Sequence, residues 1–276
     1  MPSMTGLGER ARQFLDLHVP GTPLLMPNPW DAGSARLLAS LGFRALATTS
    51  SGHASTLGRL DGEVSRDEAL THAAAVVAAV DIPVSADLEN GFADDPAGVV
   101  ETVRRAAASG LAGCSIEDST QRADDPIYDL GLAVERVSAA VEAARATDEG
   151  IVLTARAENL LHGLDLGDTI VRLQAYEAAG ADVVFAPGLR TIEDVRAVIS
   201  SVGVPVNVLA LPGSPSVAAL ADAGVARISV GGGFAYAAMG GVVEAARELL
   251  EHGTYGFWAG ADIGRRAFRA AVTRAE

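Results

Sequence analysis

The sequence predicts a (β/α)₈ barrel from three observations: eight short β-branched runs, amphipathic helical patterns between them, and glycines where several of those patterns end. This alternation along the whole chain is the order expected of repeated βα units. Eight such units in 276 residues are typical of a (β/α)₈ barrel. An open, doubly wound sheet is the structural alternative, because strand order cannot be read from sequence.

Each element has its own local signal. The predicted strands are residues 24–26, 45–48, 84–86, 113–116, 152–155, 183–186, 205–208 and 226–230. The helical patterns between them include residues 67–79, 96–109, 133–146, 168–179, 192–200, 214–223 and 236–250. Ser65 followed by Glu68 is a capping box, and Asp95-Pro96 is a second helix-start signal. Gly110 fits the left-handed position just after a helix.

Composition limits both the domain count and the partners. No linker or composition break interrupts the chain, so we expect residues 1–276 to form a single barrel domain, with residues 254–276 as a C-terminal helical extension. The formal charge of −14 argues against nucleic acid and anionic membranes as partners. Anionic substrates remain compatible, because a bound cation and local arginines can reverse the potential inside a pocket.

The chain has features of a cytoplasmic protein. One cysteine, Cys114, excludes an intrachain disulfide and a cysteine metal cluster, which fits a reducing compartment. Residues 1–17 carry scattered charges without a continuous apolar segment, so we expect no secretory signal. No stretch approaches the roughly 18 apolar residues of a membrane span.

Acidic residues directly follow two predicted strands and are the most informative part of the sequence. Asp87 and Glu89 follow the third strand, and Glu117 and Asp118 follow the fourth. Strand interiors reject charge, so these carboxylates should meet on the C-terminal face, where barrels keep their active sites. Hard oxygen ligands suit Mg²⁺, with Mn²⁺ as the alternative ion. Asp87, Glu89 and Glu117 together therefore predict a metal site, whereas Asp94, Asp95 and Asp118 are more simply explained as helix caps.

Other polar motifs end strands on the same face. The motifs in chain order are Asn28-Pro29-Trp30-Asp31-Ala32, Thr48-Thr49-Ser50-Ser51-Gly52, Gly58-Arg59-Leu60-Asp61-Gly62, Asp87-Leu88-Glu89-Asn90-Gly91-Phe92, Ile116-Glu117-Asp118-Ser119, Ala155-Arg156-Ala157-Glu158, Pro205-Val206-Asn207-Val208 and Arg227-Ile228-Ser229-Val230-Gly231. Their order and spacing resemble the isocitrate lyase/phosphoenolpyruvate mutase superfamily, from about residue 24 to residue 260. The resemblance implies a Mg²⁺-dependent barrel that acts on small 2-oxo acids or their phosphono analogues through a pyruvate enolate.

The resemblance also implies roles for single residues. Asp87 would be the direct metal ligand, Glu89 replaces the family's more usual second aspartate, and Asp61 and Glu117 would act through metal-bound waters. Arg156 would neutralise the developing oxyanion, although an ion pair with an inward acid is its alternative role. The candidate substrate-binding residues are Trp30, Thr49, Ser50, Ser51 and Asn207. For Trp30, packing of the first loop against the barrel is an equal alternative.

Two departures from the family narrow the chemistry. Lyases of the family that act on isocitrate and methylisocitrate carry a Lys-Lys/Arg-Cys-Gly-His motif after the fourth strand, and its cysteine protonates the departing enolate. Here residues 119–126 read Ser-Thr-Gln-Arg-Ala-Asp-Asp-Pro, and Cys114 lies earlier, where we interpret it as a small core residue. Pro187 replaces a histidine of the phosphonomutase branch. These departures argue against isocitrate-type cleavage and weaken a mutase assignment.

Three functional hypotheses follow. The first is a Mg²⁺-dependent lyase that cleaves a C–C bond of a small 2-oxo acid, with oxaloacetate decarboxylation as the first candidate. The alternative is a phosphonate-processing enzyme of the phosphoenolpyruvate mutase, carboxyphosphonoenolpyruvate phosphonomutase or phosphonopyruvate hydrolase type, in which Thr120, Gln121 and Arg122 would bind the phosphoryl group. The third, a non-catalytic sensor of a 2-oxo acid and metal, is disfavoured because a binder does not need the full set of acids and the arginine.

Weaker signals concern assembly and phosphate binding. Residues 255–259 read Tyr-Gly-Phe-Trp-Ala, and exposed aromatics of this kind often mark an interface. The resemblance suggests a homotetramer or homodimer in which C-terminal helices exchange. Gly231-Gly232-Gly233 could cradle a phosphate, although a tight strand-to-helix turn explains it better. We interpret His53 as a solvated loop residue and His72 as a surface residue.

Overall fold

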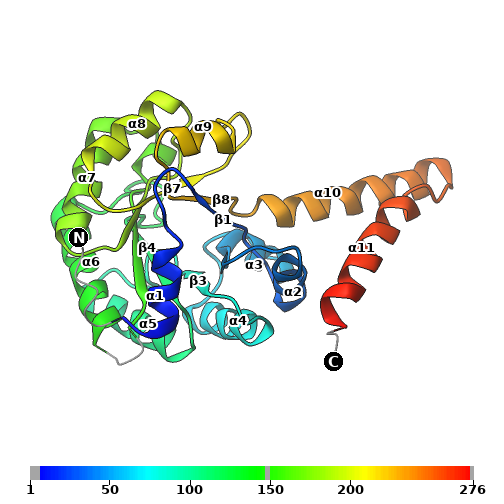
Figure 1. The fold of residues 1–276 in the computed structure, drawn as a ribbon, viewed down its shortest axis with the longest axis horizontal. Helices are drawn as coiled ribbons and strands as arrows, with labels where there is room; N and C mark the ends of the chain where they lie inside the picture. Colours follow the sequence, from blue (N-terminus) through cyan, green and yellow to red (C-terminus); the bar gives the residue numbers. More distant parts are fainter. Residues whose placement is uncertain (1–6, 147–149, 274–276) are drawn as a thin grey trace.

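The computed structural model describes residues 7–146 and 150–273, which form a barrel of eight parallel strands surrounded by helices (Figure 1). The strands are β1 (Leu24–Met26), β2 (Leu46–Ala47), β3 (Val84–Asp87), β4 (Gly113–Glu117), β5 (Val152–Arg156), β6 (Val183–Phe185), β7 (Val206–Leu209) and β8 (Arg227–Ser229). Each agrees with its prediction to within one residue at either end. Strands β2 to β8 pair in sequence order and β1 pairs with β8, so the barrel is confirmed over the doubly wound sheet.

The barrel is completed between β1 and β2, where no strand ladder forms in the described chain. One backbone hydrogen bond, from Ala47 N to Pro27 O at 3.1 Å, joins the two strands. The side chain of Asn28 donates to the carbonyl oxygen of Thr48 at 3.0 Å and accepts from the N–H groups of Val230 and Gly231 at 3.0 and 2.9 Å. Asn28 therefore joins the ends of β1, β2 and β8 at the C-terminal face.

The helices follow the predicted pattern, and the short helices α3 and η1 add to it in two strand-to-helix connections. They are α1 (Glu9–Asp16), α2 (Ala32–Ser40), α3 (Ser50–Thr56), α4 (Arg66–Ala79), α5 (Pro96–Ala108), α6 (Leu130–Arg145), η1 (Asn159–His162), α7 (Leu166–Ala178), α8 (Ile192–Ser201), α9 (Val217–Asp222), α10 (Gly233–Arg247), η2 (Glu248–His252) and α11 (Trp258–Val272). The capping box of Ser65 and Glu68 and the Asp95 cap are both present. Helix α3 contains His53, which we interpreted as a loop residue. The Thr49 side chain accepts from Gly52 N and so caps the start of this helix.

The core lies between the barrel and its helices, and it is built mainly of Val, Leu, Ile and Ala. Cys114 belongs to it and is fully buried, as predicted, and burial raises the pKa of its thiol to about 12. No helix within residues 7–146 and 150–273 is both long and apolar enough to cross a membrane. Residues 1–6, part of the segment used to exclude a secretory signal, lie outside the described residues.

The two C-terminal helices extend from the barrel (Figure 1). Helix α10 leaves β8 and projects outward with only Ala235 buried, and α11 folds back toward α2. The predicted extension is therefore described up to residue 273, and residues 274–276 lie outside the described part. Large exposed hydrophobic residues are concentrated here: Phe234, Tyr236, Met239, Val242, Val243, Leu249, Leu250, Tyr255, Trp258, Ile263, Phe268 and Val272.

Candidate active site

A cavity of about 570 Å³ opens at the C-terminal ends of the barrel strands. Nine of the ten predicted site residues line it: Thr49, Ser50, Ser51, Asp61, Asp87, Glu89, Glu117, Arg156 and Asn207. Trp30 does not line it. Its carbonyl oxygen contacts the His72 ring at 3.0 Å, and a Cβ on Gly52 would lie 3.3 Å from the Trp30 Cβ. The structure therefore supports the packing role of Trp30 and not substrate contact.

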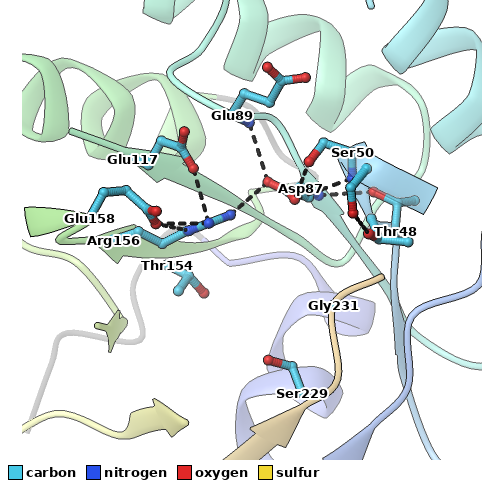
Figure 2. A network of polar contacts seen from close by, with 12 residues as sticks. Thr48, Ser50, Asp87, Glu89, Glu117, Thr154, Arg156, Glu158, Ser229 and Gly231 are labelled. Carbon is cyan, nitrogen blue, oxygen red and sulfur yellow. Dashed lines mark hydrogen bonds and ion pairs between the residues drawn. The ribbon is translucent and has the colours of Figure 1, made fainter. Parts of the chain in front are cut away.

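Arg156 is the centre of the acidic cluster (Figure 2). It ends β5, and its guanidinium contacts Asp87 at 2.8 Å, Glu117 at 3.1 Å and Glu158 at 2.8 Å. It also lies over the ring of Phe185, 5.0 Å from the ring centroid. Both sequence-based roles of Arg156 are therefore compatible with its position: it pairs with inward acids, and it faces the cavity where an oxyanion could form.

The cluster carries more negative than positive charge, and the pKa values reflect this. Burial, followed by the charges of neighbouring acids, raises the pKa of Glu117 well above its ordinary value, although Arg156 opposes the shift. Burial also raises the pKa of Glu158 and of Asp61. For Arg156, the charges of Glu158, Glu117 and Asp87 outweigh burial and raise the pKa well above its ordinary value. A group that adds positive charge would therefore be stabilised here.

Asp87 accepts hydrogen bonds from several directions. Its Oδ2 accepts from the Ser50 hydroxyl at 3.1 Å and more weakly from the Ser50 N–H at 3.4 Å, and its Oδ1 accepts from Glu89 N at 3.3 Å. The Asp87 N–H donates to the Thr48 hydroxyl oxygen at 2.9 Å, which fixes the end of β3 against β2. Ser50 and Ser51 lie in the first turn of α3, so the predicted carboxylate-binding hydroxyls flank the predicted metal ligand.

Glu89 stands on a strained turn. Its φ of 48° lies in the left-handed region, which non-glycine residues rarely adopt outside functional sites. Arg136 holds this turn in place: it is buried, stacks on Tyr128 at 4.1 Å and donates to the carbonyl oxygens of Asn90, Ala93 and Asp94. Gln121 donates to the Glu89 carboxylate. Burial and the charge of Asp87 raise the pKa of Glu89 to about 7.

The donors fit a hydrated Mg²⁺ ion. Within the part of the chain that the structure describes, no three Asp, Glu, His or Cys side chains converge closely enough to hold an ion. Arg156 lies between Asp87, Glu117 and Glu158 and separates them. Mg²⁺ commonly takes one or two carboxylates and keeps several waters. Asp87 as the direct ligand, with the other acids acting through water, satisfies that requirement with oxygen donors alone.

Some site residues were missed or misread in the sequence. Glu158 was overlooked, although it is an acid two residues beyond a strand end, the same signal that identified Glu89. Asp118 is not a helix cap: it is buried and accepts from Glu158 N at 2.8 Å, Arg172 at 3.1 Å and Tyr176 at 2.5 Å. It therefore supports the turn that carries Glu158.

Three further predictions are corrected. Asp94 is not a cap either, because its carboxylate accepts from Tyr128 and Arg122. His53 is part of α3, not of a loop, and it stacks on His72 with ring centroids 3.8 Å apart. His72 is half-buried on α4 and is not a surface residue.

Comparisons with known proteins agree with this geometry. Residues 14–250 match the family described as Phosphoenolpyruvate phosphomutase. The chain shares 51% sequence identity with a lyase/mutase from Burkholderia cenocepacia J2315 of known crystal structure. The two structures superimpose with a TM-score of 0.92 over 96% of each chain. It is 32% identical over 214 residues to oxaloacetate decarboxylase from Paraburkholderia xenovorans, covering 75% of this chain and 68% of that protein.

Another relative, 2-methylisocitrate lyase from Escherichia coli, is 30% identical over 211 residues, or 70% of each protein. The family match, these relatives and the barrel with its acidic strand ends lead to one conclusion. The chain belongs to the phosphoenolpyruvate phosphomutase family, within the isocitrate lyase/phosphoenolpyruvate mutase superfamily of lyases and mutases that act on small acids.

Proposed function

We propose that the protein is a Mg²⁺-dependent lyase that cleaves a C–C bond of a small 2-oxo dicarboxylate, with decarboxylation of oxaloacetate as the first candidate. One observation carries the proposal: the Asp87, Arg156 and Glu117 cluster faces a cavity whose described lining contains no Cys, His, Lys or Tyr. Such a site can stabilise an enolate, and its proton-exchanging groups are carboxyls, among them Glu89 with a pKa of about 7. Decarboxylation needs little more than stabilisation of the enolate.

The chain's own residues account for the remaining steps. Mg²⁺, when bound, would supply Lewis-acid polarisation of the 2-oxo and carboxylate oxygens. Ser51 would donate to the substrate carboxylate from the start of α3, and Ser50 would join it by giving up the hydrogen bond that its hydroxyl donates to Asp87. As the C–C bond breaks, its electrons move into the enolate and CO₂ leaves. Arg156 would hold the negative charge on the enolate oxygen, and a proton from water would then complete pyruvate.

The phosphonate-processing alternative draws support from the description of the matching family. Its expected phosphoryl-binding residues, however, have other partners. Thr120 donates to the carbonyl oxygen of Asp125, Gln121 donates to Glu89, and Arg122 contacts Asp94 and Asp125. The glycine triplet also offers little to a phosphate, because Gly231 N already donates to Asn28. These contacts favour a carboxylate substrate over a phosphono acid.

The test is pyruvate formation from oxaloacetate and from phosphonopyruvate, each with Mg²⁺ and with EDTA. EDTA-sensitive turnover of oxaloacetate well above the metal-only background would support the proposed decarboxylase. Turnover of phosphonopyruvate alone would move the protein to the phosphonate branch. Tight binding of pyruvate or oxalate without turnover of any candidate would favour the sensor.

We also propose that the chain assembles as a homo-oligomer in the cytoplasm, as a homotetramer or a homodimer. The exposed apolar side chains of α10 and α11 support it, because exposed apolar residues gathered on one part of a protein commonly mark an interface. Val242 is 69% exposed and Leu250 85% exposed, so the single chain leaves them without cover. A light-scattering mass equal to one chain would contradict the assembly.

A further inference from the structure

A second, much smaller cavity adjoins the active-site cavity, between the end of β3 and the helices α3 and α4. Its volume is about 10 Å³, close to the least that can hold one water molecule. His53 and His72 line it, and most of its other lining residues are polar as well. Thr49, Asp87 and Glu89 line both cavities, so only these side chains lie between the two.

His53 has a buried nitrogen without a partner. Its Nδ1 is buried and has no hydrogen-bond partner within residues 7–146 and 150–273. The ring is nevertheless held in place: it stacks on the His72 ring, whose Nε2 lies 3.0 Å from the carbonyl oxygen of Trp30. Burial lowers the pKa of both rings, that of His72 to about 4, so both are neutral near neutral pH. Ordered water is a common partner for such a buried nitrogen, and the small cavity has room for one.

Thr49 connects the small cavity to the hydroxyl groups of α3. Its Oγ1 accepts from Gly52 N at 3.3 Å and lies 3.3 Å from Ser51 Oγ, where either hydroxyl could be the donor. A hydroxyl oxygen has two lone pairs and one proton. When a water also donates to Thr49, both lone pairs of Thr49 are occupied, so Thr49 must donate to Ser51. Without that water, Ser51 can donate to Thr49 instead.

The direction of the hydrogen bond between Thr49 and Ser51 decides what Ser51 offers to a substrate. When Ser51 accepts, its own proton remains free for an anion in the active-site cavity, which Ser51 lines. When Ser51 donates to Thr49, that proton is already used. The Ser50 hydroxyl is no substitute, because it donates to Asp87. The arrangement with the water is therefore the one that presents a free donor to the substrate.

We propose that the small cavity binds one internal water between His53 Nδ1 and Thr49 Oγ1, and that this water orients the Ser51 hydroxyl toward the substrate carboxylate. His53 is then a positioning residue that acts on the substrate through the water and the two hydroxyls, and His72 holds its ring. This inference rests on the proposed function, since it takes Ser51 to bind a carboxylate of the substrate.

The water itself is tested in the wild-type protein. A high-resolution crystal structure should show a water within about 3.2 Å of both His53 Nδ1 and Thr49 Oγ1. Density without a water at this place, or a water that contacts only one of the two atoms, would overturn the proposal. This measurement does not depend on the folding of any variant.

The effect on a ligand is tested by calorimetric titration with oxalate in the presence of Mg²⁺. Oxalate carries carboxylates but cannot form an enolate, so binding is measured without turnover. His53→Leu should lower the oxalate affinity by about tenfold, the scale of one hydrogen bond to a charged group. His53→Asn keeps a polar atom near the place of Nδ1 and should stay within about threefold of the wild-type affinity. Both variants lose the ring stack on His72, so the difference between them isolates the polar atom.

A double-mutant cycle tests the route through Ser51. Ser51→Ala alone should lower the oxalate affinity by about tenfold, and adding His53→Leu should lower it by no more than about twofold further. A merely structural role of His53 would make the two losses multiply. Multiplied losses, an unchanged affinity in His53→Leu, or an equal loss in His53→Asn would overturn the proposal.

The titration requires no turnover, so its failure is distinct from failure of the proposed reaction. EDTA-sensitive oxaloacetate turnover beside an oxalate affinity that does not depend on His53 would count against the inference alone. An affinity that depends on His53 only while Ser51 is present, without turnover of any 2-oxo acid, would support the water site and count against the reaction. Wild-type protein that binds no oxalate would overturn the inference.

Discussion

Arg156 and Arg227 both line the cavity and lie in one register row of the barrel, yet their surroundings are opposite. Arg156 contacts three carboxylates, and these charges raise its pKa. Arg227 donates to neutral acceptors, and burial, followed by the charge of Arg156, lowers its pKa to about 9. The difference shows that the cavity is polarised, with excess negative charge on one wall and an unbalanced cation on the other. A substrate with two unlike ends would be oriented by such a field.

Removal of Asp87 would break this contrast most completely. Asp87→Ala should lower metal-dependent kcat by roughly a thousandfold or more, because loss of several kcal/mol of Lewis-acid stabilisation has that effect. Pyruvate formation at saturating oxaloacetate and Mg²⁺ measures it. Asp95→Ala is the matched control: it removes only the cap of α5, costs about 1 kcal/mol of stability and should keep its activity. Wild-type turnover by Asp87→Ala would refute the metal assignment.

Arg156 is the next most sensitive position. Arg156→Ala should lower kcat by roughly a hundredfold or more, on the scale of losing one oxyanion donor. Arg156→Lys keeps the charge without the planar guanidinium and should recover part of the loss. Arg105→Ala, which removes an exposed pair with Asp67, is the control and should leave kcat unchanged. An unaffected kcat in Arg156→Ala would limit this arginine to ion pairing.

The acidic residues that line the cavity should also make the stability of the fold depend on pH. The pKa of Glu89 rises from 4.5 to about 7 on folding, so between these values the folded state binds a proton that the unfolded state has lost. The contribution of this proton to the free energy of unfolding is present in full below pH 4.5 and is lost as the pH rises toward 7. In EDTA, the midpoint temperature of thermal unfolding should therefore fall by more between pH 5 and pH 7.5 for the wild-type protein than for Glu89→Gln. Parallel curves for the two proteins would contradict the shifted pKa.

Substitution of Cys114 should have the smallest effect on activity, because this residue belongs to the hydrophobic core and does not line the cavity. Cys114→Ser should lower stability by about 1–3 kcal/mol through burial of a hydroxyl, with kcat within about twofold of wild type. Chemical denaturation and the pyruvate assay measure the two effects. A folded variant without activity would show that the thiol takes part in catalysis.

The fold was predictable because its signals are local. Most strands are short apolar runs, and β3, β4 and β5 end in charged residues, so the barrel and its acidic face follow from pattern alone. The convergence of Asp87, Glu117 and Arg156 also follows, because parallel strands end at one face.

Other features depend on contacts between residues far apart in the sequence, and pattern did not reveal them. His18 and Arg227 are 209 positions apart, and neither residue type at its position indicates the other. Asp118 has the sequence signal of a cap, yet burial next to Arg172 and Tyr176 gives it a different role. Trp30 was ambiguous because a tryptophan after a strand can face either the cavity or the neighbouring helix.

The side chain of Asn28 has a consequence for biosynthesis. It binds Val230 and Gly231 across 202 and 203 positions of the chain, at the seam where β1 and β2 form no ladder. Contacts between residues so far apart in the sequence form late in folding, since a large loop must be ordered before they can form. Until β8 and Gly231 have left the ribosome, β1 and β7 lack their shared partner strand, and both keep an open edge. Such edges are prone to pair with other chains, so translation pauses before this point would expose the protein to aggregation.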